Sequence, residues 1–273
     1  MVAVSVIIPT FNRRDRVREA VASVLSQERA DYELIVVDDG STDGTDAALA
    51  PLASRLRYVR QDNRGVSAAR NAGAALALGA WLAFLDSDDV WLPNKLAVQL
   101  AHAAAHPDMR VCQTGEIWIR NGVRANPCAH HRKPDGDIFV ASLQRCVVSP
   151  SAVMLRRDLF DAVGGFDERL PACEDYDLWL RIARTTPVDL IDQPVVIKYG
   201  GHADQLSRRY WGMDRFRVRA LRKLLDDPTL DQSRRCAVQA VLAKKCAILA
   251  QGAAKRGRMD EANTYTRLAD HHV

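Results

Sequence analysis

The sequence predicts an α/β fold in which a mostly parallel sheet is flanked by helices and a helical extension follows at the C-terminus. In the first third of the chain, four short runs of β-branched and apolar residues alternate with segments of helical spacing. Such alternation is typical of parallel strands joined by right-handed helical crossovers. Beyond residue 207, helical spacing continues to the end of the chain. A chain of 273 residues is long enough for one large domain with a smaller appendage.

The individual elements follow from the same pattern. The expected strands are Val4–Ile8, Leu34–Val37, Leu56–Arg60 and Trp81–Leu85. The expected helices between them are Asp15–Leu25, Thr45–Ser54 and Ser67–Leu78. The expected helices of the tail are Arg208–Leu225, Gln232–Lys255 and Asp260–Asp270, divided by Pro228 and Gly257. Ala and Leu dominate the apolar faces of these tail helices, so we expect them to pack as a small bundle.

Polar residues follow each of the four expected strands. These segments are PTFN at 9–12, DDGS at 38–41, QDNRG at 61–65 and DSDD at 86–89. Helix caps and turns also use Asp, Asn and Ser. Capping does not explain adjacent Asp residues, however, because they repel each other unless a cation or a hydrogen-bond donor lies between them. Ligands of parallel sheets bind outside the carboxyl ends of the strands, so the sequence predicts a binding site at this edge.

Asp86 and Asp88 are the strongest candidates within that edge. They lie in FLDSDDVW, where an apolar strand delivers two carboxylates one residue apart. Such carboxylates can share a divalent cation that also holds a diphosphate, and Mn²⁺ or Mg²⁺ suits the site because both accept oxygen ligands and keep positions for phosphate and water. The cation would offset the charge that builds up on a departing diphosphate. A bare DxD triplet is weak evidence, and the three similar strand ends beside it strengthen it.

The composition excludes several classes of protein. With 48% hydrophobic and 26% charged residues, the chain is neither disordered nor collagen-like. The net charge of +4 is too small to indicate a nucleic-acid partner. The segment from Gly200 to the end is basic, with 15 Lys or Arg against 8 Asp or Glu. It could contact an anionic membrane or a phosphate-bearing acceptor, or it could consist of solvated helix faces. An apolar stripe on these helices could pair two subunits as a homodimer or dock on the rest of the chain.

We expect a cytoplasmic protein, with the inner face of the membrane as a further location. The first residues, MVAVSVIIPTFNRR, lack the basic lead and the cleavage site of a signal peptide. The longest uncharged stretch, Asn71 to Leu85, is too short to span a bilayer. The six cysteines contain no CxxC pair, which fits reduced thiols. Residues 121–137 predict a long loop, in which Cys128, His130 and His131 match no zinc-ligand spacing, so that a solvated loop is favoured over a zinc site.

Six ordered motifs resemble a known family, the family-two glycosyltransferases. The motifs are SVIIPTFNR, VDDGSTDGT, NRGVSAARNAG, FLDSDDVW, GGFDERL and CEDYDLWLRIA, and the resemblance covers about Val4 to Ser207. The family has the GT-A fold, a Rossmann-like α/β architecture. The resemblance implies a catalytic domain at 1–206, with a nucleotide-sugar binding half at 1–107 and an acceptor-binding half at 108–206. Residues 207–273 would then be a C-terminal helical extension.

The resemblance also implies roles for single residues of the nucleotide site. Pro9 and Thr10 would line the nucleotide pocket together with Asn12 and Ser87, and Arg70 would lie near the base or the phosphates. Asp39 would accept a hydrogen bond from the imide of the base. A carboxylate in that place selects uracil or thymine against cytosine, since an unpaired buried polar group costs about 1–3 kcal/mol.

Further roles concern the ribose, the metal and the phosphates. Asp86 would lie near the ribose, Asp88 would bind the metal, and His202 is similar to a third metal ligand or a diphosphate contact. A lone His is often structural, so both readings of His202 stay open. Gly200 and Gly201 occupy the stretch where relatives have an arginine, for which Arg208 or Arg209 could substitute.

The motif CEDYDLWLRIA provides a candidate base. Inverting transfer requires the acceptor hydroxyl to lose its proton as it attacks the anomeric carbon, and a positioned carboxylate can take that proton. By resemblance this carboxylate is Asp175, whose pKa the neighbouring Glu174 could raise. The alternative is that Glu174, Asp175 and Asp177 only favour a helix N-terminus. Trp179 and Trp211 could stack on sugar rings or belong to the core.

The leading hypothesis is an inverting, metal-dependent glycosyltransferase that uses a UDP- or dTDP-sugar. Its acceptor would be a glycan or a lipid-linked glycan, as in bacterial surface polysaccharide synthesis, which is an inference by family analogy. A non-catalytic sugar-nucleotide-binding or scaffold protein is the alternative, against which the presence of Asp86, Asp88 and Asp175 argues. A sugar nucleotidyltransferase would carry a Gly-rich pyrophosphate loop near its N-terminus, and PTFNRRD lacks the glycines.

Overall fold

The structure is a computed structural model, and it describes residues 2–28, 30–125, 132–201 and 210–270. Its described residues form a nine-stranded mixed sheet. The strand order is β3 (Arg57–Arg60), β2 (Tyr32–Asp38), β1 (Val4–Thr10), β4 (Trp81–Phe84), β8 (Val153–Arg156), β6 (Val111–Arg120), β9 (Asp189–Gly200) and β5 (Asp89–Trp91), with β7 (Val123–Arg124) paired to β6. The α/β class predicted from the sequence is therefore confirmed.

The first four strands, β1 to β4, form the parallel part of the sheet. β1 pairs in parallel with β2 and β4, and β2 pairs in parallel with β3. The connecting helices are α1 (Arg14–Leu25), α2 (Thr45–Leu49), which continues as the short 3-10 helix η1 (Ala50–Leu52), and α3 (Val66–Ala75). The polar segments after these strands meet at one edge of the sheet, because parallel strands end on the same side.

Two glycines allow α3 and the turn that follows it to pack closely against β1. A Cβ atom at Gly73 would lie 2.5 Å from Ile7 Cγ2, and one at Gly79 would lie 2.7 Å from the backbone nitrogen of Ser5. Both glycines were visible in the sequence within the uncharged stretch 71–85. They allow the helix and the following turn to approach the central strand without a side chain between them.

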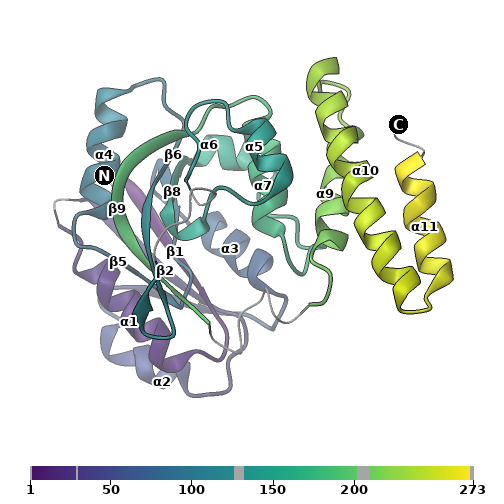
Figure 1. Cartoon of the computed structure of the whole chain (residues 1–273). Helices are drawn as coiled ribbons and strands as arrows, with labels where there is room; N and C mark the ends of the chain where they lie inside the picture. The colour runs from purple at the N-terminus through teal and green to yellow at the C-terminus, as the bar shows by residue number, and fades with distance from the viewer. Residues whose placement is uncertain (1, 29, 126–131, 202–209, 271–273) are drawn as a thin grey trace.

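The second half of the sheet departs from the expected parallel arrangement. β8 pairs antiparallel with both β4 and β6, and β5 pairs antiparallel with β9. β6 and β9 are parallel but shift register around Gly115, where a Cβ atom would lie 3.0 Å from the nitrogen of Pro194. Figure 1 shows β9 as a long curved strand, in agreement with such an irregularity. The curved pair β6–β9 forms one wall of the cavity described below.

The part of the chain after β5 adds helices on both faces of the sheet. They are α4 (Lys95–Ala105), α5 (Phe139–Gln144), the short 3-10 helix η3 (Pro150–Ala152), α6 (Arg157–Ala162) and α7 (Glu174–Ala183). The tail consists of α9 (Asp214–Leu225), α10 (Gln232–Lys255) and α11 (Met259–Asp270), so α10 has the bounds that the sequence predicts. Figure 1 shows the three tail helices on the side of α7 and α5, with α11 outermost.

One apolar cluster joins the sheet to the tail. It extends from Ile7 and Phe84 in the sheet through Trp179 of α7 to Leu221 of α9 and Leu242 of α10. The expected tail bundle is present, and it buries its apolar faces against α5 and α7 as well as within itself. A division of the chain at residue 206 stays a prediction. In the described residues no helix combines the length and the apolar character needed to cross a membrane.

Candidate functional site

A cavity of about 1880 Å³ lies at the carboxyl ends of β1, β2 and β4. The start of α7 and the strands β6 and β9 contribute its other walls. All the predicted site residues that the structure describes line it: Pro9, Thr10, Asn12, Asp39, Arg70, Asp86, Ser87, Asp88, Glu174 and Asp175. His202 and the alternatives Arg208 and Arg209 lie outside the described residues, as do Cys128, His130 and His131. Residues as many as 166 positions apart, from Pro9 to Asp175, therefore line one cavity, and the roles predicted for them stay predictions.

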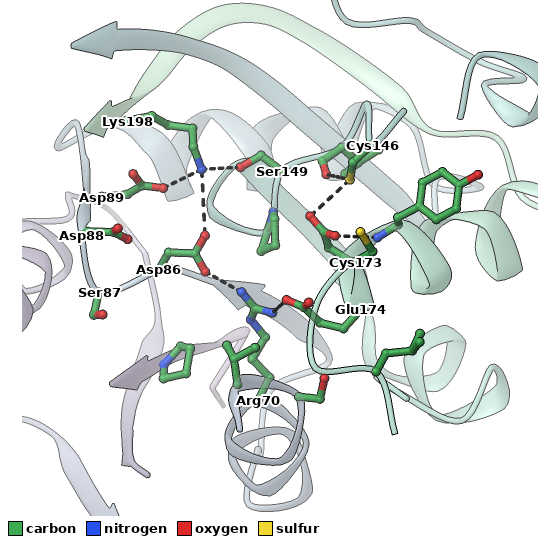
Figure 2. Close-up of a pocket in the computed structure, with 18 of the residues that line it drawn as sticks. Arg70, Asp86, Ser87, Asp88, Asp89, Cys146, Ser149, Cys173, Glu174 and Lys198 are labelled. Atoms are coloured by element: carbon green, nitrogen blue, oxygen red, sulfur yellow. Dashed lines mark hydrogen bonds and ion pairs between the residues drawn. The ribbon is translucent and has the colours of Figure 1, made fainter. Parts of the chain in front are cut away.

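Arg70 lies at the centre of the site and joins two carboxylates. Its Nη2 donates to Asp86 Oδ1 at 2.6 Å, and its Nη1 donates to Glu174 Oε1 at 2.7 Å. The guanidinium is buried, with 4% of the side chain exposed, and it lies over the ring of Phe166 at 5.0 Å. Figure 2 shows it rising from α3 between the end of β4 and the start of α7. Arg70 thus connects the expected nucleotide side of the cavity to Glu174, the residue before the expected base Asp175.

The pKa values of the two carboxyls respond differently to Arg70. Burial acts to raise the pKa of Asp86, but Arg70 and Lys198 outweigh it, and the pKa is lowered. Burial, followed by the charge of Asp175, raises the pKa of Glu174 although Arg70 opposes this. Glu174 is the more buried of the two, with 6% of its side chain exposed against 25% for Asp86. Desolvation therefore decides the direction at Glu174 and ion pairing decides it at Asp86.

Lys198 was not found by sequence reasoning, and it lies beside the DSDD segment. Its Nζ donates to Asp89 Oδ2 at 2.7 Å and to Ser149 Oγ at 2.9 Å, and it is 3.9 Å from Asp86 Oδ2 (Figure 2). Burial acts to lower the pKa of this ammonium, but the neighbouring carboxylates outweigh it, so the pKa is raised. Lys198 is therefore a fixed positive charge at the end of β4.

The three Asp residues of DSDD have separate partners. Asp86 faces Arg70, and Asp88 Oδ2 forms an ion pair of 2.8 Å with Nη1 of Arg13. Asp89 is buried and accepts from Ser151 Oγ at 2.6 Å in addition to Lys198. The repulsion that makes adjacent Asp residues unusual in a turn is thus offset by cations from three different elements.

Asn12 and Asp39 hold the loops at the other end of the cavity. Asn12 has a φ of 51° and accepts from the backbone N–H of Thr42 at 2.8 Å. Asp39 Oδ1 accepts from Gln61 Nε2 at 2.7 Å and from the N–H of Arg64 at 3.0 Å. Asp39 Oδ2 accepts from the N–H of Gly65 at 2.8 Å. Both residues line the cavity, and both also have a structural function that the sequence did not reveal.

The start of α7 places Glu174 and Asp175 in the cavity. Cys173, which precedes them, has a φ of 59°, a left-handed conformation that is uncommon for a residue with a side chain. Asp175 Oδ1 accepts from the N–H of Tyr176 at 2.7 Å, and its Oδ2 lies 3.2 Å from the thiol of Cys146. The single proton of this thiol is shared between Asp175 and the carbonyl oxygen of Val148, which is 3.1 Å away. Both carboxylate oxygens are thus oriented. Non-glycine residues in strained conformations cluster at functional sites.

Three acidic residues at the start of α7 have different surroundings. Asp177 is buried and pairs with Arg181 Nη2 and Lys223 Nζ, each at 2.8 Å, so it connects α7 to α9. Glu174 faces Arg70, and Asp175 is partly exposed in the cavity. Stabilisation of a helix N-terminus alone would explain why all three residues are acidic. It does not explain why each of the three has different partners.

The tryptophans of the cavity differ from those considered in the sequence. Trp179 is 1% exposed and belongs to the core, and Trp211 is 45% exposed but does not line the cavity. Trp118, which the sequence did not single out, is 38% exposed and lines it. Phe11, which follows β1, is 40% exposed and lines the other end. Strand alternation alone would have placed Trp118 on one face of β6, but it could not tell which face borders the cavity.

Comparison of the sequence with known protein families identifies the family of this chain. The sequence profile described as "Glycosyl transferase family 2" matches residues 5–164, which is more than half of the chain. The chain belongs to glycosyl transferase family 2. A second profile, described as "Glycosyltransferase like family 2", matches residues 137–224 and so extends into α9.

Relatives of this family-two chain include an uncharacterized glycosyltransferase of Rickettsia felis (strain ATCC VR-1525 / URRWXCal2). It is 30% identical over 217 residues, which is 76% of this chain and 35% of the relative. The chain spans between 31% and 65% of the length of the curated Rickettsia relatives that it matches. A UDP-Glc:alpha-D-GlcNAc-diphosphoundecaprenol beta-1,3-glucosyltransferase of Escherichia coli, WfgD, is 30% identical over 191 residues, covering 69% of this chain and 73% of WfgD.

The fold of the family-two chain is similar to that of S. aureus TarS. The structure of TarS 1-349 in complex with UDP-GlcNAc matches with a TM-score of 0.71 and 18% identity, covering 97% of this chain and 90% of TarS 1-349. The match includes the tail as well as the sheet. The GT-A fold expected from the sequence motifs is therefore confirmed.

The family implies a divalent cation, and the residues present can be tested for it. Asp88 offers carboxylate oxygens, which Mg²⁺ and Mn²⁺ prefer. Among the described residues, no three side chains of His, Cys, Asp or Glu lie close enough together to hold a metal ion. The described residues thus fit a cation that takes one carboxylate from among them, with phosphate oxygens and water as further ligands. Arg13, which now pairs with Asp88, would have to give way.

Proposed function

We propose that this chain transfers a sugar, with inversion, from a nucleotide diphosphate sugar to the hydroxyl group of an acceptor. One observation carries the proposal. Asp175, a carboxylate with both oxygens oriented, lines the same cavity as the Asp86–Asp88 segment, and Arg70 and Glu174 connect the two. A base on one side of a cavity and a phosphate-binding segment on the other is the arrangement that displacement at an anomeric carbon requires.

The nucleotide would bind between the ends of β1 and β2. Asp39 accepts three hydrogen bonds from described residues, and a carboxylate has about four acceptor positions, so one remains for the imide N–H of uracil or thymine. The exposed ring of Phe11 in the same wall suits stacking on a base. Both features support a UDP- or dTDP-linked donor, and Pro9, Thr10, Asn12 and Ser87 would complete the pocket.

The diphosphate would lie near Asp88, Arg13 and Lys198. When bound there through Asp88, Mn²⁺ or Mg²⁺ would supply a Lewis acid for the leaving diphosphate. Lys198 and Arg13 add positive charge from the protein itself, and Lys198 stays protonated because carboxylates surround it. Developing negative charge on the leaving oxygen is stabilised most by groups that are already oriented. His202 remains a further candidate for this end of the cavity.

Asp175 would act as the base. The acceptor oxygen attacks the anomeric carbon from the face opposite the diphosphate, the bond to the diphosphate oxygen breaks, and the acceptor proton passes to a carboxylate oxygen of Asp175. The N–H of Tyr176 and the thiol of Cys146 hold that carboxylate in one orientation and leave further acceptor positions for the hydroxyl. Glu174 keeps Arg70 in place and is not itself the base.

The acceptor would be a glycan, and a lipid-linked one is supported by the relative WfgD, whose printed name states a diphosphoundecaprenol acceptor. The exposed basic residues of the tail fit a peripheral contact with an anionic membrane surface, where such an acceptor would lie. We place the catalytic domain at 1–206 and the extension at 207–273. The protein would work at the cytoplasmic face of the membrane.

Thermal shift with a panel of nucleotide sugars tests the proposal. UDP-, dTDP- and GDP-sugars and CMP-sialic acid are added with and without Mn²⁺, and we expect stabilisation by UDP- or dTDP-sugars that increases with Mn²⁺. Asp175→Asn should bind the same donor with unchanged affinity and release no nucleotide diphosphate when acceptor is present. A chain stabilised by none of these donors would be a scaffold protein, and an Asn variant that turns over normally would exclude Asp175 as the base.

A further inference from the structure

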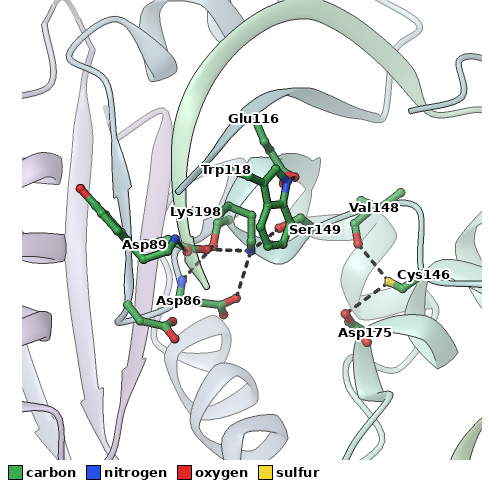
Figure 3. Close-up of polar contacts among 12 residues, drawn as sticks. Asp86, Asp89, Glu116, Trp118, Cys146, Val148, Ser149, Asp175 and Lys198 are labelled. Atoms are coloured by element: carbon green, nitrogen blue, oxygen red, sulfur yellow. Dashed lines mark hydrogen bonds and ion pairs between the residues drawn. The ribbon is translucent and has the colours of Figure 1, made fainter. Parts of the chain in front are cut away.

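Trp118 occupies a distinctive position in the wall of the cavity. Residues 116, 118 and 120 of β6 alternate toward the same face, and all three line the cavity. On the neighbouring strand β9, Lys198 is the register partner of Trp118, and its Nζ lies 5.6 Å from the centre of the indole ring. Figure 3 shows the indole above Lys198 and Ser149, with Asp175 on the other side of the open space.

The indole is held in place by a buried carboxylate. Its Nε1 donates to Glu116 Oε2 at 3.2 Å, and Glu116 Oε1 forms an ion pair of 3.0 Å with Lys133. Glu116 exposes 6% of its side chain and Lys133 exposes 13%. Burial acts to raise the pKa of Glu116, but Lys133 and Lys198 outweigh it and keep the carboxylate ionised. A ring fixed in this way loses little further freedom when a ligand covers it.

The other tryptophans do not compete for this role. All five lie in the described part of the chain, and Trp118 alone among them lines the cavity. Trp91 and Trp179 are each 1% exposed, Trp81 is packed under Arg156 at the start of β4, and Trp211 lies on the tail. Trp118 is 38% exposed, so its ring presents an apolar surface to the cavity that a ligand can cover.

We propose that the exposed face of Trp118 binds a pyranose ring, with the ring hydroxyls directed to Arg120 and to the polar groups around Ser149. The C–H face of a pyranose is apolar and its edge carries hydroxyls, so an aromatic plane bordered by charged and hydroxyl side chains matches both. The inference rests on the proposed function and adds to it the part of the cavity that contacts a sugar. The pyranose can belong to the donor or to the acceptor glycan.

Two binding measurements separate these sources. In the donor arm, the affinity of UDP is compared with that of each UDP-hexose by calorimetry. In the acceptor arm, octyl and p-nitrophenyl hexopyranosides are titrated with UDP present and with UDP absent. The variants are Trp118→Ala and Trp118→Phe, and Trp211→Ala is the matched control because its indole is exposed outside the cavity.

Trp118→Ala is expected to keep the affinity for UDP and to bind pyranosides in one arm about three- to tenfold more weakly, with Phe between the two. The wild-type indole emission should change on titration in that same arm, and the Phe variant should lack this change. Equal pyranoside affinities in wild type and Trp118→Ala, or no pyranoside binding by the wild type in either arm, would overturn the inference. Failure of the proposed function is separate, since it would appear in the thermal-shift panel as no stabilisation by any of the nucleotide sugars.

Discussion

Replacing Arg70 with methionine is expected to destabilise the protein by about 3–5 kcal/mol at neutral pH, the usual cost of removing one partner from a buried ion pair. Methionine has a similar length and no charge, so the substitution removes the two hydrogen bonds of 2.6 and 2.7 Å without leaving a large cavity. Most of the cost should come from Glu174, whose side chain is 6% exposed, because Asp86, at 25%, keeps some water and retains Lys198 at 3.9 Å.

The cost should depend on pH with a definite sign. Arg70 lowers the pKa of both carboxyls, so its removal raises both in the folded state. A carboxyl whose folded-state pKa lies above its unfolded value of about 4 destabilises the protein at high pH, and the penalty is relieved as the pH falls through the folded-state pKa. The difference between wild type and Arg70→Met should therefore be largest near pH 7.5 and smaller near pH 5.5.

Urea unfolding followed by tryptophan fluorescence at these two pH values measures the difference. Arg64→Met is the control, because Arg64 also pairs with a carboxylate, that of Glu168, but the two side chains are 63% and 38% exposed. Such an exposed pair contributes about 0–1 kcal/mol. A loss below about 1 kcal/mol for Arg70→Met at pH 7.5, or an equal loss at both pH values, would refute the assignment of Arg70 as a buried bridge between two carboxyl groups.

Two further predictions concern the base and the packing of the sheet. Cys146→Ala removes the thiol donor 3.2 Å from Asp175 Oδ2, so it should lower kcat for transfer severalfold with donor affinity unchanged. Cys146→Ser should restore kcat. Steady-state kinetics on the wild type and the two variants measure this, and equal kcat values would exclude the thiol as a positioning group. Gly79→Ala should cost about 2 kcal/mol or more in urea unfolding, since the new Cβ would lie 2.7 Å from the backbone nitrogen of Ser5. Gly252→Ala in α10 is the control, because the atom nearest to its new Cβ, at 3.3 Å, is the end of a flexible arginine side chain. A small gain in the free energy of unfolding is expected for this variant. An equal effect of both changes would contradict the packing argument.

The parallel half of the sheet could be predicted because the pattern that indicates each strand or helix lies within a single segment of the sequence. β1, β2 and β4 contain short apolar runs, and β3 has Tyr58 and Val59 between two arginines. Polar residues follow each of these strands, and each expected helix has its apolar face within one segment. The mixed half of the sheet could not be predicted, because β8, β6, β9 and β5 pair across long separations and no single segment indicates its partner. The register shift at Gly115 is an example of a long-range contact that local sequence does not predict, since a lone glycine does not indicate that Pro194 will lie against it.

The site was predictable where residues follow strands and unpredictable where partners come from elsewhere. Asp86, Asp88 and Asp39 could be found because they end apolar runs, and Asp175 because of the motif around it. Lys198 lies within a strand whose alternation gives no hint of its partner, Asp89, which is 109 residues away. Cys146 had no signal at all, since nothing in the sequence places it beside α7.

Arg70 shows how the two kinds of information combine. By resemblance to the family, Arg70 would lie near the base or phosphates of the donor, and the structure pairs it with two carboxylates. Both can hold if an arriving diphosphate competes with Asp86 for the guanidinium while Glu174 retains it, because the two carboxylates bind different nitrogens of the same group. The guanidinium would then turn about its contact with Glu174, at the start of the helix that carries Asp175.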